Sequence, residues 1–207
     1  MDIMQIIEKI TRNEHSSIRC DFDKIIYVDP FNIKVSTHDA DLILITHSHY
    51  DHFDIESINK VINKNTILVF PKSMSDKERM FENYECIFLE PYEKYENIET
   101  VPAYNVNKSF HVKEDKWFGY IINYEGVKIY ISGDTDENED NKKVKCDIAL
   151  VPIGGIYTFD PKSAADFIND IKPQIVIPTH YGSIVGDESD FNTFEKFVNS
   201  DIKVIKK

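Results

Sequence analysis

The sequence has few cysteines, no long apolar run and no recognisable export signal. Its three cysteines, Cys20, Cys86 and Cys146, are scattered and form no CxxC pair, which argues against a disulfide framework and against a thiolate zinc site. No apolar stretch approaches the ~20 residues that cross a bilayer. The N-terminus lacks the basic start and apolar stretch of a signal peptide. We therefore expect a cytoplasmic protein that does not bind membranes.

Basic residues are also scarce. The chain has 24 lysines and arginines against 36 acidic residues, which gives a formal net charge of −12. Binding to nucleic acids depends largely on basic side chains that neutralise phosphates, and here basic residues form only short pairs. The composition therefore predicts no nucleic-acid partner, and it leaves the oligomeric state undetermined.

The chain has enough apolar residues for a sizeable core. Its 207 residues are 42% apolar and 29% charged, and no repeat, low-complexity segment or linker rich in proline and glycine interrupts them. A chain of this length fits one domain of ordinary to large size. We therefore expect a single domain that spans residues 1–207.

Short apolar runs alternate with amphipathic segments. Most runs are continuously apolar, which is typical of strands buried on both faces. We predict strands at residues 24–28, 41–46, 66–70, 117–123, 127–132, 147–152 and 174–178. We predict helices at residues 54–63, at residues 191–198, and between an N-cap at Asp160 and a stop at Pro173. Residues 1–10 fit either a helix or an edge strand, and the mixture predicts a layered α/β protein.

Three of the predicted strands end in a histidine or an aspartate. The run LILIT leads into His47, KIYISG into Asp134 and QIVIPT into His180. Loops at strand ends commonly hold functional side chains because the sheet keeps them rigid. Residues of metal-binding type at three strand ends therefore indicate a site.

The hexapeptide HSHYDH, residues 47–52, is the strongest signal in the chain. It contains three of the seven histidines and one aspartate. Residues two apart in an extended segment point the same way, so we expect His47 and His49 to bind one metal ion. A turn into the following helix would bring Asp51 and His52 to a second ion. Imidazole with carboxylate suits zinc, with manganese and iron as alternatives.

Two divalent ions need an anion between them. At the ~3.5–4 Å separation usual for binuclear sites the ions repel strongly. Asp134 in SGDTD is the candidate for the bridging ligand, because Gly133 permits a tight turn that brings the carboxylate into the site. His180 in PTHYG, the remaining histidine at a strand end, is predicted to bind metal as well.

The order HSHYDH, GDTD and PTHYG resembles the signature of the metallo-β-lactamase superfamily. Within it, HSSIR, VPAYN, GYII and VPIGGIYT are similar to the branch of ascorbate-6-phosphate lactonase and N-acyl-phosphatidylethanolamine phospholipase D. The resemblance runs over nearly the whole chain and implies a four-layer αββα sandwich that acts as a metal-dependent hydrolase. The implied ligands are His47 and His49 for the first metal ion, Asp51, His52 and His180 for the second, and Asp134 as the bridge.

The third ligand of the first metal ion departs from the family pattern. Relatives place a histidine where this chain has Asn105, and a neutral amide is a much weaker zinc ligand than imidazole. His111 is the alternative, either as a ligand or as a substrate contact. Of the other histidines, His15 has two alternatives, a position near the site or a hydrogen bond within the fold, of which we expect the second. We expect His38 to lie at the surface.

The predicted site would use a metal-bound hydroxide that Asp51 orients and deprotonates. Two dications with Asp51, Asp134 and one hydroxide sum to about +1, which favours a small anionic substrate such as an ester, a lactone or a phosphodiester. The glycines of GGIYT, residues 154–158, permit either close approach to a substrate or a tight turn. Two alternatives stay open: iron-dependent oxygen or persulfide chemistry, and a non-catalytic protein that kept the fold to bind metal.

Overall fold

A computed structural model describes residues 2–207, and the contacts within the chain divide it into two compact units. The first unit comprises residues 1–90 and the second residues 91–207. Each unit contains one sheet, six-stranded in the first and seven-stranded in the second. The single domain over residues 1–207 stays a prediction.

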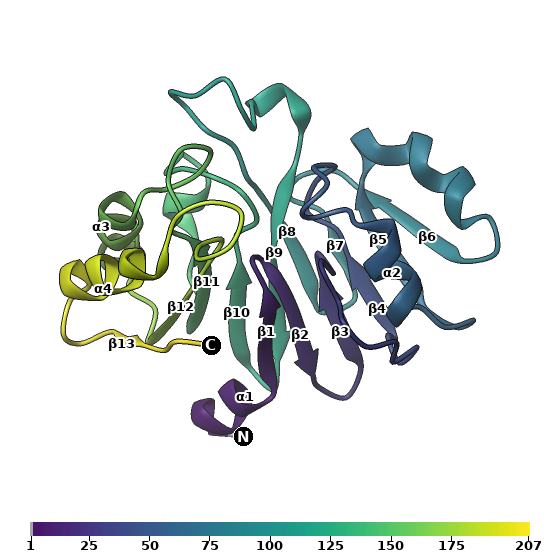
Figure 1. The fold of residues 1–207 in the computed structure, drawn as a ribbon, viewed down its shortest axis with the longest axis horizontal. Coiled ribbons are helices and arrows are strands. Elements are labelled where there is room, and N and C mark those ends of the chain that lie inside the picture. The colour runs from purple at the N-terminus through teal and green to yellow at the C-terminus, as the bar shows by residue number, and fades with distance from the viewer. Residues whose placement is uncertain (1) are drawn as a thin grey trace. The chain divides into compact units, whose positions relative to one another are not determined.

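The first unit carries a mixed sheet whose strands follow one another in chain order, β1 to β6 (Figure 1). Strands β1 to β3 are antiparallel, and β3 to β6 are parallel. Its elements are α1 (Ile3–Glu8), β1 (Ile10–Glu14), β2 (Ser17–Asp21), β3 (Ile25–Val28), β4 (Leu42–Leu44), α2 (Ile55–Val61), β5 (Ile67–Pro71), the 3₁₀ segment η1 (Lys72–Phe81) and β6 (Glu85–Leu89).

Helix α2 packs its apolar side chains on this sheet. Asp54 is its N-cap and accepts a hydrogen bond from the backbone N–H of Glu56, which satisfies one donor of the first turn. Ile58 and Val61 are fully buried and join Ile43 in one apolar cluster. The helix therefore holds the middle of the sheet in place, where β4 leads into the hexapeptide.

The second unit carries a sheet in the order β13-β12-β11-β10-β9-β8-β7. Strands β7 to β10 are antiparallel, and β10 to β13 are parallel. Its elements are β7 (Lys94–Tyr95), β8 (Ile98–Pro102), η2 (Lys113–Asp115), β9 (Phe118–Tyr124), β10 (Val127–Ile131), η3 (Asn141–Lys143), β11 (Ile148–Pro152), α3 (Pro161–Ile171), β12 (Ile175–Thr179), α4 (Glu188–Phe197) and β13 (Lys203–Val204).

Helix α3 begins and ends as its sequence predicts. The Asp160 side chain accepts hydrogen bonds from the backbone N–H groups of Lys162 and Ser163. Phe167, on the apolar stripe, stacks on Phe159 with ring centroids 5.0 Å apart. Helices α3 and α4 lie beside β11 to β13 (Figure 1), and α3 and α4 share one apolar cluster with the sheet.

All seven predicted strands and all three predicted helices are present, with ends shifted by a few residues. Of the two alternatives for the first ten residues, the helix is the one observed: α1 covers Ile3–Glu8, and β1 begins only at Ile10. The strands that were not predicted are β1, β2, β6, β7, β8 and β13. Within residues 2–207, no helix is both long and apolar enough to cross a membrane.

Candidate metal centre

The hexapeptide follows β4, which is buried between β3 and β5. His47 is 1% exposed, and its Nε2 lies 3.2 Å from Nδ1 of His49. The two imidazoles therefore meet through one nitrogen each, as the spacing of two predicts. Asp51 and His52 are also buried, and the Nε2 atom of His52 lies 3.8 Å from Oδ2 of Asp51.

Asp29 fixes the orientation of the hexapeptide through hydrogen bonds to Thr46 and His52. It follows β3, which runs parallel to β4, so the two strands end at the same edge of the sheet. Its Oδ1 accepts a hydrogen bond from the backbone N–H of Thr46 at 2.8 Å. Its Oδ2 accepts from Thr46 Oγ1 at 2.6 Å and from His52 Nδ1 at 2.7 Å. Burial raises the pKa of Asp29, while the contacts with His52 and Thr46 oppose that rise.

These hydrogen bonds decide which ring nitrogens can bind metal. His52 uses Nδ1–H for Asp29, which leaves the lone pair on its Nε2 atom. The Thr46 hydroxyl gives its proton to Asp29, so at His47 the Nδ1–H donates to Thr46 Oγ1 at 2.9 Å. The lone pair of His47 is then on Nε2, the atom that faces His49. A carboxylate behind a histidine in this way is the usual support of a metal-binding imidazole.

His15 also belongs to this group. It lies in the turn between β1 and β2, is 1% exposed, and its Nε2 is 3.3 Å from Oδ2 of Asp51. Its ligand atom and those of Asp51 and His52 all lie within 4.8 Å of one another. The side chain of His15 therefore contacts a predicted catalytic residue. We call His15, His47, His49, Asp51 and His52 the N-terminal cluster.

In the second unit, Asp134 and His180 follow parallel strands and meet at the same edge of the sheet. Asp134 comes after β10 and His180 after β12. The Nε2 atom of His180 lies 3.1 Å from Oδ2 of Asp134, and both side chains are buried. A Cβ on Gly119 would lie 2.4 Å from the carbonyl oxygens of Ile131 and Ser132, so only glycine lets β9 pack this closely against the segment that leads to Asp134.

His111 completes this second group. Its Nε2 lies 3.4 Å from the same Oδ2 of Asp134, and its Nδ1 lies 3.2 Å from the carbonyl oxygen of Tyr157. Asn105 Nδ2 also lies 3.4 Å from Nδ1 of His111, but it donates its hydrogens to the carbonyl oxygens of Phe110 and Tyr157. Since a carbonyl only accepts, we assign the proton of the neutral ring to Nδ1 and the lone pair to Nε2. We call His111, Asp134 and His180 the C-terminal cluster.

Asn105 supports His111 rather than taking its place. Its Nδ2 donates to the carbonyl oxygens of Phe110 at 2.8 Å and Tyr157 at 2.7 Å, and its backbone N–H donates to the carbonyl of His111 at 2.8 Å. Its Oδ1 is buried, and no donor among residues 2–207 bonds to it. Within the second unit, therefore, His111 and not Asn105 contacts the carboxylate of Asp134.

Three of these histidines have a left-handed backbone. The φ angles of His15, His111 and His180 are 55°, 55° and 56°. Residues other than glycine seldom adopt this conformation, and outliers of this kind gather at functional sites. His38 also has a positive φ, at 47°, but it is exposed, as predicted, and bonds to the carbonyl of Ile62. The strained backbone at three buried histidines is therefore associated with the two clusters.

The donor atoms of both clusters suit a divalent metal ion. His52 and His111 each commit Nδ1–H to a carboxylate or carbonyl and point Nε2 at another carboxylate oxygen. With a neutral ring, two lone pairs then face each other, and a cation that accepts both removes the repulsion. Protonating both rings instead would bury two imidazolium charges, which is costly without full pairing. Imidazole nitrogen and carboxylate oxygen are also the ligands that zinc prefers.

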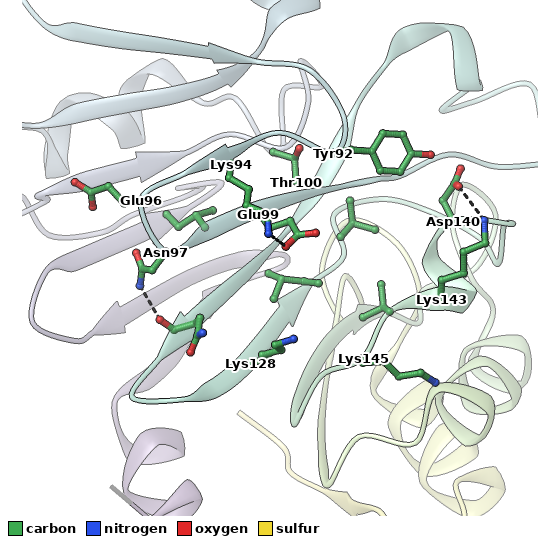
Figure 2. Close-up of a pocket in the computed structure, with 15 residues that line it drawn as sticks. Tyr92, Lys94, Glu96, Asn97, Glu99, Thr100, Lys128, Asp140, Lys143 and Lys145 are labelled. Carbon is green, nitrogen blue, oxygen red and sulfur yellow. Dashed lines mark hydrogen bonds and ion pairs between the residues drawn. The ribbon is translucent and has the colours of Figure 1, made fainter.

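A pocket of about 740 Å³ lies elsewhere in the second unit, on β7 to β10 (Figure 2). Four lysines gather there, and two of them form ion pairs, Lys94 with Glu99 and Lys143 with Asp140. None of the predicted ligands lines this pocket. Its mixed charges and the absence of the predicted ligands from its lining give it no part in the site described above.

Comparison with known proteins supports the reading of these motifs. Residues 9–180 match the family model of the beta-lactamase superfamily domain. A metal-dependent hydrolase from Pyrococcus furiosus is 30% identical to the chain, with 95% of both chains covered. The crystal structure of a protein described as a metal-dependent hydrolase from Parabacteroides distasonis matches with a TM-score of 0.79 and 28% identity, covering 96% of this chain and 91% of that one. The α/β fold of metallo-β-lactamase type is thereby confirmed.

A more distant structure shares the fold but carries other chemistry. CmlA, a diiron beta-hydroxylase from Streptomyces venezuelae, matches with a TM-score of 0.77 at 12% identity, covering 96% of this chain and 52% of that one. At this identity the likeness concerns the fold alone.

Proposed function

The chain belongs to the beta-lactamase superfamily and is a metal-dependent hydrolase, and we propose that it cleaves a small anionic ester, lactone or phosphodiester. We propose further that the N-terminal and C-terminal clusters together hold two divalent ions. The family match over residues 9–180 supports this, because it includes every member of both clusters. Zinc is our first choice of metal, with manganese or iron as alternatives.

We assign the ligands from the chemistry of each cluster. His47 and His49 would bind the first ion, with His111 as its third ligand in place of Asn105. Asp51, His52 and His180 would bind the second ion, with Asp134 between the two. The support for His111 is its Nε2 lone pair, which the hydrogen bond from Nδ1 to the carbonyl of Tyr157 leaves directed at Asp134.

The single observation that carries this proposal is the pairing of buried imidazole nitrogens with carboxylate oxygens. In each unit a histidine donates one N–H to a fixed acceptor and turns its other nitrogen to an aspartate: His52 to Asp51, and His111 to Asp134. A structural hydrogen-bond network would place a donor opposite each acceptor. A metal site places acceptors opposite acceptors, and the tautomers assigned above give this arrangement for His52 with Asp51 and for His111 with Asp134.

The protein's own residues would orient the substrate and move a proton. Bound divalent ions supply Lewis acidity and lower the pKa of water bound to them. Asp51 would take the proton of the attacking water, and His15, 3.3 Å from its Oδ2, would hold that carboxylate in position. Two dications against the carboxylates of Asp51 and Asp134 leave an excess of about two positive charges, which favours an anionic substrate.

Metal analysis of the protein purified without chelator tests the metal centre. We expect about two ions per chain in the wild type and at most one in Asp134→Asn. Asp136→Asn is the matched control, because Asp136 lies two residues away and pairs with Lys108 instead. His111→Ala should lose an ion, whereas Asn105→Ala should keep both ions with weaker affinity. One ion or none in the wild type would refute the binuclear proposal.

A panel of small phosphodiesters, lactones and carboxylic esters, measured with the metal-loaded protein, tests the reaction. We expect turnover of at least one class, lost in Asp134→Asn and kept in Asp136→Asn. Bound iron with a visible absorption band and oxygen consumption would favour the iron-dependent alternative. Two bound ions with no turnover of any class would favour a non-catalytic protein. The absence of a nucleic-acid partner, the cytoplasmic location and the lactonase and phospholipase D branch stay predictions.

A further inference from the structure

Five large apolar side chains are exposed on three segments that adjoin the C-terminal cluster. Exposure of large apolar groups in one place commonly marks a binding surface. The segments are residues 105–111, which contain His111, residues 154–159, and residues 181–186, which follow His180. The exposed side chains are Val106 (61%), Phe110 (46%), Ile156 (71%), Tyr157 (36%) and Ile184 (40%), which we call the apolar rim.

Hydrogen bonds tie the first two segments of the rim together. The carbonyl oxygen of Tyr157 accepts from Asn105 Nδ2 and from His111 Nδ1. The Nζ atom of Lys108 donates to the carbonyl oxygen of Thr158 at 2.5 Å. The rings of Phe110 and Tyr157 pack edge to face with centroids 4.8 Å apart. The contact that sets the tautomer of His111 therefore also positions the rim.

The third segment is held against the second by a close backbone approach. A Cβ on Gly154 would lie 2.2 Å from the carbonyl oxygen of His180 and 2.9 Å from Cγ2 of Val185. Only glycine at this position lets the two segments come so close. Ile184, next to Val185, is thereby kept near the loop that carries Ile156.

Ile156 has a backbone conformation that disfavours isoleucine. Its φ is 55°, in the left-handed region, where β-branched residues are true outliers. Asparagine or glycine would relieve the strain, and a polar residue would suit the 71% exposure better. Isoleucine at this position is unfavourable both because of its backbone conformation and because its apolar side chain is exposed to water. This combination points to a function for the side chain.

We infer that the apolar rim binds the alkyl or acyl part of the substrate while the metal centre binds its anionic group. The substrate is then an amphiphile with an apolar chain. This inference rests on the proposed function. The segments of the rim contain His111 and directly follow His180, which favours a part of the substrate over a second copy of the chain as the occupant. Lys108, which lies in the first of the three segments, is paired with Asp136, and this argues against an anionic lipid surface as the occupant.

Binding of n-alkylphosphonates, from methyl to octyl, to the zinc-loaded protein tests this inference by calorimetry. The charged group stays the same in this series and only the chain grows. We expect the Kd to fall two- to fourfold for each methylene from propyl to hexyl, since burial of a methylene is worth up to about fourfold. In the double variant Phe110→Ser/Ile156→Asn we expect the Kd to fall less than 1.5-fold for each methylene. The Kd of methylphosphonate for this variant should lie within twofold of the wild-type value.

Phe197→Ser is the matched control, because Phe197 is an exposed aromatic residue at the end of α4 that packs under Lys162 and Lys196. It should keep the wild-type dependence on chain length. Zinc content is measured for every variant. A wild-type Kd that does not vary with chain length, or an equal dependence in the double variant, overturns the inference while a full zinc content leaves the proposed function standing. A protein without bound zinc overturns both. A dimer that the double variant dissociates, with no change in chain-length dependence, would assign the rim to a second copy instead.

Discussion

Replacing Asp29 with asparagine changes the charge beneath the N-terminal cluster and almost none of its volume. Asp29 accepts three hydrogen bonds, from the backbone N–H of Thr46, from its hydroxyl and from Nδ1 of His52. Asparagine has one acceptor oxygen, and its NH₂ group must face at least one of these donors. A buried donor without an acceptor costs about 1–3 kcal/mol. We expect the metal-free variant to lose that much of its free energy of unfolding.

The same substitution should weaken metal binding. If the amide nitrogen faces His52, the imidazole accepts at Nδ1 and carries its proton on Nε2, the atom that we assign to the metal. Loss of such a supporting carboxylate typically costs 10–100-fold in metal affinity, or about 1.4–2.7 kcal/mol. Zinc affinity would be measured by competition with a chromophoric chelator, and stability by urea denaturation with Trp117 fluorescence.

Asp39→Asn separates these effects from a general loss of stability. Asp39 lies in the same unit and accepts hydrogen bonds from Arg19 and Tyr27, outside the cluster. The Asp39→Asn variant should have a lower free energy of unfolding than the wild type and an unchanged zinc affinity. If Asp29→Asn bound zinc within twofold of wild type, Asp29 would not set the tautomer of His52, and the assignment of Nε2 as the ligand would be wrong.

Three further predictions concern stability. Asp160→Ala removes the N-cap of α3 and should lower the free energy of unfolding by about 1 kcal/mol in urea denaturation. Burial acts to raise the pKa of Asp140, but contacts with Tyr92, Tyr104 and nearby lysines lower this pKa overall. The ionised carboxylate therefore stabilises the folded state at pH values above its unfolded pKa of about 4, and this stabilisation is lost as the pH falls through the lower folded pKa. In Asp140→Asn, the free energy of unfolding measured by calorimetry should therefore fall less steeply than in the wild type as the pH is lowered below about 4. An equally steep fall in the variant would refute this. Zinc at 100 times its Kd should add about 2.7 kcal/mol, removed by chelator, and an equal melting temperature with and without zinc would contradict binding to the folded state alone.

Local patterns were sufficient to predict the main strands and the ends of helix α3. The apolar run before His47 and the Asp160-Pro161 pair each carry their signal within a few residues. Strand β7 has only two residues and β6 begins with a polar residue, so neither has a local apolar pattern from which a strand could be predicted. Edge strands of this kind form because a neighbour offers hydrogen bonds, which a local pattern does not record.

The parts of the site that depend on strand pairing were not predicted. Asp29 meets Thr46 and His52 because β3 and β4 are parallel neighbours, and His15 meets Asp51 because the turn between β1 and β2 lies close to the hexapeptide. These contacts join residues 17 to 36 positions apart in the chain. His111 was one of two alternatives for its position, and the contact of its Nε2 atom with Oδ2 of Asp134 distinguishes it from Asn105.

The left-handed backbone of His15, His111 and His180 has a consequence for large-scale mutagenesis. Glycine and asparagine relieve the strain at these positions, so such variants should express as folded protein at least as well as the parent. Valine and isoleucine add strain and should be depleted even where only solubility is selected. A screen that measures only the yield of folded protein would therefore score some inactive variants above the wild type. A second screen that measures metal retention would be needed to show that histidine is preferred at these positions.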